Sequence, residues 1–370
     1  MKIVMFTNTY LPRVGGVARS VSTYEDAFFR RGHEVRIVAP KFEGAEDTSG
    51  RVLRTPAIQH FNGSDFSVQI PVPGLLADFV DEFRPDLLHS HHPFLLGDSA
   101  LRLAWARRLP LVFTYHTMYE QYTHYVPGNS DAIKRFAIQM STDYCNLCTH
   151  VIAPSESVAK LLAQRGVTTP VTSIPTGVNA EFFASGDRAR ARQRFNIDPD
   201  AIVVGHVGRL AAEKNLDYLA RAVDRFLAEQ PKSMFLLVGS GESGESIKRI
   251  MQRAEAARQL VMPGCLTGQD LADAYAAIDV FAFSSQSETQ GMVLAEAMAA
   301  GATAVALDAS GAREIVNDEN GRLLRDDATE EEYAQALVEV TSDARRLRTL
   351  RAAARLAAHE FSIENCSSRL

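Results

Sequence analysis

Cysteine is scarce in this chain of 370 residues, which has only Cys145, Cys148, Cys265 and Cys366. Four cysteines in a chain of this length provide no disulfide framework and fit a reducing cytoplasm. Cys145 and Cys148 have the C-x-x-C spacing, but the sequence offers no second pair, and the two fall inside a helical pattern. We therefore expect two buried thiols here rather than a zinc or redox site.

Long hydrophobic runs are also missing. No stretch approaches 18 uninterrupted apolar residues, and the apolar start of the chain reaches the polar residues Thr7 and Asn8 at once. We therefore expect a first strand rather than a signal peptide, and no segment that spans a membrane. Neither charge dominates, since 39 basic residues stand against 45 acidic ones. That balance argues against wholesale binding of nucleic acid.

Short apolar runs alternate with helix-length segments, and the series restarts after a charged run from Gly186 to Arg194. Strands separated by helices are typical of βαβ units in a parallel sheet. We therefore predict an α/β protein with two Rossmann-like, doubly wound domains, residues 1–176 and 177–355, and a segment 356–370 that packs back on the first domain. Residues 330–359 lack proline and glycine and should be helical. The predicted strands are Ile3–Phe6, Val35–Ala39, Leu87–His89, Leu111–Tyr115, His150–Ala153, Val171–Ile174, Ile202–Val207, Met234–Val238, Gln259–Pro263, Val280–Ser284 and Ala302–Ala306.

Two loops after predicted strands carry groups that suit an anionic ligand. Gly15 and Gly16 stand between the first strand and its helix, where backbone N–H groups can reach an anion, although a tight turn explains the pair equally well. Arg209 follows a strand of the second domain and Lys214 lies at the next helix start, which suits a diphosphate but also fits a solvated loop. The dinucleotide fingerprint G-x-G-x-x-G is absent, so hydride chemistry loses its main support.

Two glutamates stand eight residues apart around the start of another predicted helix. Glu288 lies in a polar loop after a strand, with Gly291 permitting close approach of the backbone. Glu296 lies about two helical turns later, inside an apolar run. Two carboxylates facing one ligand can accept hydrogen bonds from sugar hydroxyls, although both could be ordinary surface residues. A carboxylate at the position of Glu296 needs a partner.

These elements resemble the retaining glycosyltransferases of the GT-B fold, of the family 4 type. The resemblance is carried, in chain order, by the Pro12–Gly16 loop, the Pro175–Asn179 linker with Phe182, the Gly208–Asn215 element and the pair Glu288 and Glu296. It covers nearly the whole chain, and it implies two Rossmann-like domains facing a central cleft. One departure is Thr303, where these enzymes usually have proline, and no expected ligand contact depends on it.

The resemblance also implies a role for each matched residue. The cations would hold the donor diphosphate, the glycine amides would contribute from the first domain, Glu296 would hold the ribose, and Glu288 with the backbone after it would fix the donor sugar. No metal or other cofactor is implied, because fixed cations and helix dipoles neutralise the leaving phosphate. The implied donor-binding residues are Gly15, Gly16, Arg209, Lys214, Glu288, Thr289, Gln290, Gly291 and Glu296, and the implied catalytic residues are His116, Arg209, Lys214 and Glu288.

An aromatic segment of the first domain is the candidate acceptor site. Residues 115–125 contain four tyrosines and two histidines, which is too polar for a bare core. His116 follows a strand end, and enzymes of the family have a matching histidine near the sugar and the acceptor. Zinc is weakly supported because H-E-x-x-H is absent, and we expect at least one of His91 and His92 only to pack. The expected acceptor-binding residues are His116, Tyr119, Glu120, Tyr122 and His124.

The function expected from this resemblance is transfer of glucose from UDP-glucose to diacylglycerol or another membrane lipid by a cytoplasmic enzyme, peripheral on the inner face of the membrane. A soluble or lipopolysaccharide sugar acceptor is the alternative within the family. A dinucleotide-dependent oxidoreductase and a non-catalytic sugar-nucleotide binder are alternatives from other classes. Two segments with cationic flanks, Leu101–Leu109 and Ala132–Met140, could meet an anionic membrane surface or simply pack on the sheet.

Overall fold

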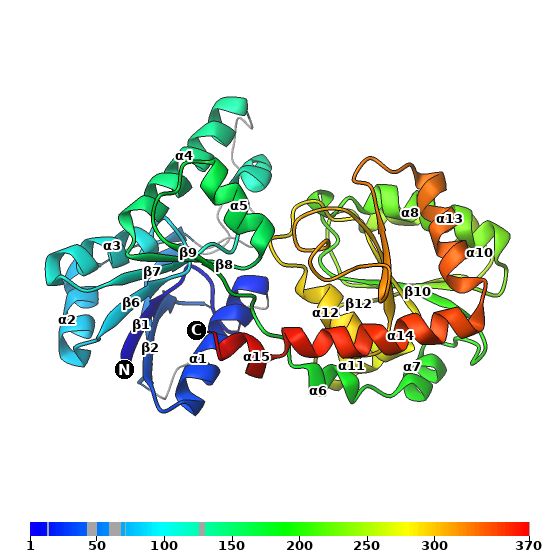
Figure 1. Ribbon diagram of the computed structural model, residues 1–370, viewed down its shortest axis with the longest axis horizontal. Helices are drawn as coiled ribbons and strands as arrows, with labels where there is room; N and C mark the ends of the chain where they lie inside the picture. The colour runs from blue at the N-terminus through cyan, green and yellow to red at the C-terminus, as the bar shows by residue number, and fades with distance from the viewer. Residues whose placement is uncertain (13–14, 43–49, 59–67, 71, 126–129, 370) are drawn as a thin grey trace. The chain divides into compact units, whose positions relative to one another are not determined.

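The computed structural model describes residues 1–12, 15–42, 50–58, 68–70, 72–125 and 130–369. Its chain divides into two compact units, Met1–Gly177 with Cys366–Leu370, and Val178–Asn365. Each unit has a parallel sheet with helices on both faces (Figure 1). The predicted α/β class with two doubly wound domains is therefore confirmed.

The first unit is built on a seven-stranded sheet. Its strand order reverses between β1 and β6, and such a switch point is where open α/β sheets bind ligands, at the carboxyl ends of the strands. The strands lie in the order β3 (Val52–Thr55), β2 (Glu34–Pro40), β1 (Lys2–Phe6), β6 (Leu87–Ser90), β7 (Leu111–Thr114), β8 (His150–Ala153) and β9 (Val171–Ser173). The other elements are α1 (Gly16–Arg30), β4 (Ala57–Ile58), β5 (Val68–Gln69), α2 (Pro73–Phe83), α3 (Leu96–Arg107), η2 (Tyr119–Tyr125), α4 (Asp131–Leu147) and α5 (Glu156–Gln164). The short helix α15 (Ile363–Ser367) begins in the second unit and ends in the first.

The second unit is built on a six-stranded sheet whose order reverses between β10 and β13. The strands lie in the order β12 (Leu260–Gly264), β11 (Met234–Val238), β10 (Val203–Val207), β13 (Val280–Phe283), β14 (Thr303–Leu307) and β15 (Gly321–Leu324). The helices are α6 (Ala180–Ala184), α7 (Arg188–Arg194), η3 (Ala212–Lys214), α8 (Leu216–Glu229), α9 (Gly244–Ile250), α10 (Gln252–Ala256), α11 (Gly268–Ala277), α12 (Met292–Ala299), α13 (Glu330–Thr341), α14 (Ala344–Ala358) and η4 (His359–Phe361).

The expected helical tail is confirmed, and it consists of two helices. The chain breaks between α13 and α14 because Asp343 caps the second helix, accepting hydrogen bonds from the backbone N–H groups of Arg345 and Arg346. No helix in the described part of the chain is long and apolar enough to cross a membrane.

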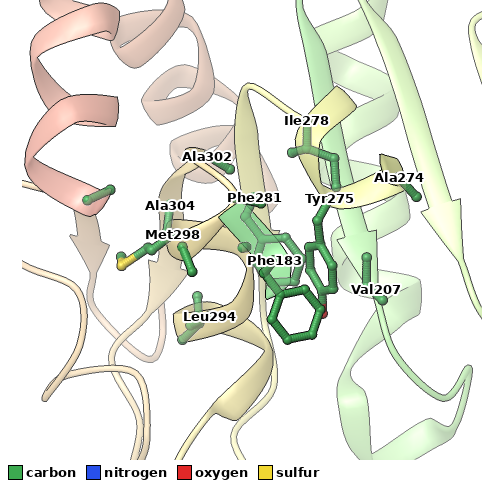
Figure 2. Close-up of a cluster of buried hydrophobic side chains, with 14 of the residues drawn as sticks. Phe183, Val207, Ala274, Tyr275, Ile278, Phe281, Leu294, Met298, Ala302 and Ala304 are labelled. Carbon is green, nitrogen blue, oxygen red and sulfur yellow. The ribbon is translucent and has the colours of Figure 1, made fainter. Parts of the chain in front are cut away.

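The core on one face of the second sheet is filled largely by aromatic rings and alanines (Figure 2). Phe183 packs edge-to-face on Tyr275 at a centroid distance of 5.2 Å, and Tyr275 lies against Phe281. Gly205 of β10 is required here, because a Cβ at that position would stand 2.4 Å from the side chain of Ile278. Helix α11 can therefore lie close to the sheet, with Tyr275 buried in its centre.

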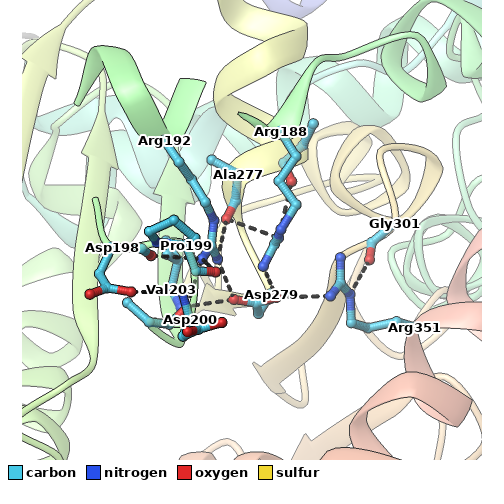
Figure 3. Close-up of polar contacts among 12 residues, drawn as sticks. Arg188, Arg192, Asp198, Pro199, Asp200, Val203, Ala277, Asp279, Gly301 and Arg351 are labelled. Atoms are coloured by element: carbon cyan, nitrogen blue, oxygen red, sulfur yellow. Dashed lines mark hydrogen bonds and ion pairs between the residues drawn. The ribbon is translucent and has the colours of Figure 1, made fainter. Parts of the chain in front are cut away.

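Asp279 joins several elements at the amino-terminal edge of the second sheet (Figure 3). One carboxylate oxygen accepts from Arg188 at 2.7 Å and from Arg351 at 2.8 Å. The other accepts from Arg192 at 2.8 Å and from the backbone N–H of Val203 at 3.0 Å. Because the side chain of Asp279 is only 3% exposed, these groups replace the water that its charge would otherwise need.

The same arginines also neutralise two helix ends. Arg188 and Arg192 donate to the carbonyl of Ala277 at the end of α11, and Arg351 donates to the carbonyl of Gly301 just after α12. The carboxyl ends of helices carry partial negative charge, so these contacts compensate part of the cationic excess around Asp279.

Replacing Asp279 with Asn should destabilise the second unit, because three guanidinium groups lose the carboxylate that they share. Breaking a buried ion pair typically costs about 3 kcal/mol or more, which for a unit of this size lowers Tm by roughly 10 °C. Scanning calorimetry of the full chain measures the change. The control is Asp318→Asn, which removes an exposed pair with Arg322 and should leave the melt nearly unchanged; equal melts for both variants would contradict the prediction.

Candidate functional site

The two loops at the switch point of the second sheet are tied together by a cation and a carboxylate. Lys214 ends η3 after β10, Glu288 lies in the loop after β13, and their Nζ and Oε1 atoms are 2.5 Å apart. Ser284 donates to the carbonyl of Lys214 at 3.1 Å, and Ser287 donates to the carbonyl of Glu213 at 3.1 Å. These contacts therefore join the loop after β10 to the loop after β13.

Arg209, the other expected cation, follows β10 directly and pairs with Glu213 four residues on. Its side chain is half exposed, whereas that of Lys214 is 14% exposed. Both cations of the expected diphosphate clamp thus lie at the carboxyl edge of the sheet, each with a carboxylate beside it. An incoming anion would have to attract them away from these partners or join them.

Two glycines let the loop after β13 pack backbone against backbone. Gly291 has φ +72°, and a Cβ there would stand 2.6 Å from the carbonyl oxygen of Gly311. Gly311 has φ +81°, and a Cβ there would stand 2.7 Å from the carbonyl carbon of Gln290. Both positions therefore require glycine. Gly291 and Gln290 were expected from the sequence, but Gly311 was not, because its importance depends on a contact twenty residues away.

Glu296 lies on α12 with 3% of its surface exposed. Its Oε2 accepts a hydrogen bond of 2.6 Å from the hydroxyl of Tyr275 on α11. The aromatic core on this face of the sheet therefore supplies the partner that a carboxylate in an apolar run needs. Thr289, between the two glutamates, is partly exposed.

His206, near the end of β10, is a further polar group of this edge that the sequence did not indicate. Its Nδ1 lies 3.0 Å from the carbonyl of Ala282, and its ring stacks on Phe281. Burial lowers the pKa of His206 to about 4, and nearby Lys214 acts in the same direction. From the sequence alone, a histidine inside an apolar strand pattern does not indicate that it lies near this edge of the sheet.

In the first unit, the glycine pair opens the helix that follows β1. Gly16 is the first residue of α1 and Gly15 precedes it with an extended backbone. A Cβ at either position would have open space around it, so packing within the described chain does not require glycine there. An anion could approach the N–H groups of this helix end, and a tight turn is the other interpretation of the glycine pair. Arg13 and Val14 of the same loop lie outside the described residues.

The candidate acceptor residues gather around η2, just after β7. Tyr119 packs edge-to-face on Phe94 and Tyr115, with centroids 5.5 and 5.9 Å away. Glu120 forms a buried ion pair with Arg165, the residue that follows α5. A guanidinium nitrogen of Arg165 lies 2.5 Å from Oε1 of Glu120, and Arg165 also donates to the hydroxyl of Tyr115. This contact shows that the Glu120 carboxylate also holds η2 against α5.

The remaining candidates differ in how much the structure says of them. Tyr122 is partly exposed on η2, and the side chain of His124 lies outside the described residues. His116 is partly buried, and its Nε2 lies 2.8 Å from Nδ1 of His91. The Nδ1 of His92 accepts from the backbone N–H of Asn8 at 3.1 Å, which fixes the loop after β1.

Comparison with known proteins identifies the family. Residues 14–182 match the family model for Glycosyltransferase Family 4, and residues 187–357 match that for glycosyl transferases group 1. The chain is 30% identical over 336 residues to the GDP-mannose-dependent alpha-mannosyltransferase of Mycobacterium tuberculosis, covering 88% of this chain and 83% of the relative. The chain belongs to glycosyltransferase family 4. The predicted resemblance is thus confirmed, and the oxidoreductase alternative does not hold.

Another relative of this family 4 glycosyltransferase is named for a glucosyl lipid rather than for mannose. The chain is 29% identical over 317 residues to the alpha-monoglucosyldiacylglycerol synthase of Acholeplasma laidlawii, covering 81% of this chain and 78% of the relative. In fold it is similar to Anabaena HepE in complex with UDP and glucose, with a TM-score of 0.78, 20% identity and coverage of 100% and 98%.

The cysteines of the C-x-x-C pair and the acidic triplet of the transferase lie on other elements than the loops that carry Lys214 and Glu288. Cys145 is buried at the end of α4, and burial raises its pKa to about 12; burial also raises the pKa of Cys148. No group of three possible metal ligands occurs in the part of the chain that the structure describes. The sequence has one D-x-D triplet, Asp198-Pro199-Asp200, and it lies ahead of β10, at the sheet edge opposite Lys214 and Glu288.

The buried histidines of the first unit should make the transferase acid-sensitive. Burial lowers the pKa of His89 and of His92 to about 3, and lowers the pKa of His91 and His116 well below the usual range. Because an unfolded histidine has a pKa of about 6.5, the unfolded chain takes up protons below that pH that the native state excludes. Stability is therefore fully present above about pH 6.5 and falls as the pH decreases toward the native values.

At about pH 5, His89 and His92 should each cost roughly 2 kcal/mol of unfolding free energy relative to neutral pH. Urea unfolding, followed by the fluorescence of Trp105 in the first unit, measures the loss. A His89→Gln/His92→Asn variant should show a weaker pH dependence, whereas His359→Gln, at an exposed position, should behave like the wild type. A wild-type unfolding free energy that stays constant over this range would show that the histidines are not buried as neutral rings.

Proposed function

We propose that this glycosyltransferase moves glucose from UDP-glucose to the hydroxyl of a membrane lipid such as diacylglycerol, with retention of the anomeric configuration and without a metal ion. The observation that carries the proposal is the pair of Lys214 and Glu288, which holds a cation and a carboxylate 2.5 Å apart at the switch point of the second sheet. A sugar diphosphate needs such neighbours, a cation for phosphate oxygens and a hydrogen-bond acceptor for sugar hydroxyls.

In this reaction the bond from the anomeric carbon to a diphosphate oxygen breaks, and a bond from that carbon to the acceptor oxygen forms. The acceptor proton passes to the departing diphosphate. Arg209 and Lys214 stabilise the negative charge that develops on the leaving group. Fixed cations at these positions make a metal ion unnecessary for that charge. The N-terminal amides of α1 at Gly15 and Gly16 are a second candidate anion site, which belongs to the first unit.

The nucleotide and sugar contacts divide between the two glutamates. Glu288 and the backbone of Thr289, Gln290 and Gly291 fix the sugar, and Glu296 holds the ribose. The Tyr275 hydroxyl orients the Glu296 carboxylate. The glucosyl relatives support glucose as the transferred sugar. Because other relatives are named as GDP-mannose-dependent, the choice of donor has to be tested by experiment.

For the acceptor, the structure favours one of the two cationic segments. On α3, Arg102 pairs with Asp98 at 2.7 Å and Arg107 pairs with Asp81 at 2.5 Å, so these two cations are largely compensated. Their charge is therefore less available to an anionic surface than that of the cations on α4. Arg108, exposed just after the helix, is the one cation of this segment for which the described chain has no ion pair.

Helix α4 presents an exposed aromatic ring beside two exposed cations. Phe136 is 67% exposed, and neither Lys134 nor Arg135 has an ion pair within the described chain. The first turns of α4 project from the first unit, and this helix packs against η2, where the expected acceptor residues lie (Figure 1). An apolar side chain flanked by lysine and arginine suits an anionic lipid surface.

The division between the glutamates predicts separable defects. Glu296→Gln should weaken binding of UDP alone, because a ribose contact is lost, whereas Glu288→Gln should leave UDP affinity nearly intact and lower glucose transfer by roughly a hundredfold. Calorimetry with UDP and a transfer assay with labelled UDP-glucose, both with EDTA present, measure the two effects. Tyr275→Phe should repeat the Glu296 defect more weakly. Equal losses for both glutamate variants would refute the division, and a transfer rate that requires added manganese would refute metal independence.

The lipid acceptor predicts binding to anionic vesicles at low ionic strength. Each cation near such a surface contributes about 1 kcal/mol, so replacing Lys134 and Arg135 with Gln and Phe136 with Ser should weaken sedimentation with phosphatidylglycerol vesicles by more than tenfold. The matched control on α3, Arg102→Gln with Trp105→Ser, should bind nearly as well as the wild type. A wild type that ignores anionic vesicles and glycosylates a soluble sugar well would refute the lipid acceptor and leave the donor half of the proposal standing.

A further inference from the structure

Three imidazole rings form a column at the carboxyl edge of the first sheet, and we call His89, His91 and His116 the histidine column. His89 and His91 are two residues apart at the end of β6, so their side chains point to the same face. Ring centroids are 4.2 Å apart between His89 and His91, and 5.1 Å apart between His91 and His116. Tyr24 of α1 lies 6.0 Å from both His89 and His91. These stacked rings leave His91 little freedom to rotate.

His91 is fully buried and hydrogen-bonded to His116. Its Nδ1 lies 2.8 Å from Nε2 of His116, and its own Nε2 is buried without a protein partner in the described chain. The titratable groups around it are His89, His92, His116 and Tyr24, none of which is an anion near neutral pH. Nothing among these groups favours a charged imidazole, so the contact joins two neutral rings.

A contact between two neutral imidazoles requires one N–H and one lone pair. If His116 gave the proton, His91 would carry its own proton on Nε2, as a buried N–H without a protein acceptor. If His91 gives the proton from Nδ1, its Nε2 holds only a lone pair. Buried N–H groups without a partner are rarer in proteins than acceptors with unused lone pairs, so the second arrangement is favoured.

We propose that His91 is a positioning residue for His116: its Nδ1–H donates to Nε2 of His116 and thereby keeps the proton of His116 on Nδ1. With Nε2 taken up by His91 and the proton on Nδ1, His116 has no lone pair with which to take up the acceptor proton. This assigns His116 a binding role and leaves the proton to the departing diphosphate. The part that concerns substrate rests on the proposed function, whereas the tautomer does not.

Nitrogen chemical shifts of the full chain labelled with 15N-histidine test the tautomer at a pH of about 7.5, where these buried histidines are neutral. We expect the His116 signals, assigned through a His116→Asn variant, to show a protonated Nδ1 and an unprotonated Nε2. His91→Phe keeps an aromatic ring in the column but has no N–H, so His116 should lose its single tautomer. Transfer kcat/KM should then fall at least about tenfold.

His91→Asn provides the conservative variant, because its side-chain amide can place an N–H near the position of Nδ1, and it should restore most of the activity and the His116 tautomer. His89→Phe is the matched control, since His89 bonds to Thr114 rather than to His116. A native His116 with its proton on Nε2 would overturn the proposal, and so would unchanged His116 signals in His91→Phe. If His91→Phe fails to fold, the native spectrum and His91→Asn still decide. If the wild type transfers no sugar, the proposed function is refuted. The nitrogen chemical shifts then still test the role of His91.

Discussion

The contact of Asp279 with three arginines is the interaction on which the second unit depends. In a parallel sheet every strand ends at the same edge, so the helices that follow run back and end at the opposite one. At that opposite edge, α11 and α12 bring their partially negative carboxyl ends together, and Arg188, Arg192 and Arg351 bind both these carbonyls and Asp279 (Figure 3). With the amino edge closed in this way, the carboxyl edge remains for ligands, and the N-termini of α8 and α12 begin there.

The sequence was sufficient for the fold because the signals of a doubly wound domain are local. Alternating apolar runs and helix-length segments predicted the strands of both sheets apart from β3 and β15, whose residues follow no clear pattern. The three arginines around Asp279 escaped notice because Arg192 and Asp279 are 87 residues apart. A charged run near residue 190 indicates a solvated helix equally well, and only the packing of α7 on α11 distinguishes the two.

The candidate site shows the same limit. The apolar surroundings of Glu296 announced a buried carboxylate that needs a partner, but the identity of Tyr275 depends on how α11 packs against α12. Gly311 had no local signal, since its need for glycine arises from the backbone of Gln290. On α3, Arg107 appeared as available as Lys134 until the fold placed Asp81 beside it. A sequence gives the number of charged side chains. Only the fold shows which of them have an oppositely charged neighbour.

The carboxyl edges of the two sheets differ in the charge of the groups that they carry. In the second unit, Lys214 and Glu288 form an ion pair, as suits a diphosphate and a polar sugar. In the first unit, the edge is lined by buried imidazoles whose pKa values are lowered, so it offers neutral hydrogen-bonding groups. Burial disfavours the charged imidazole, so the histidines of the first unit stay neutral near neutral pH. The second unit keeps its cation charged because Glu288 lies beside Lys214.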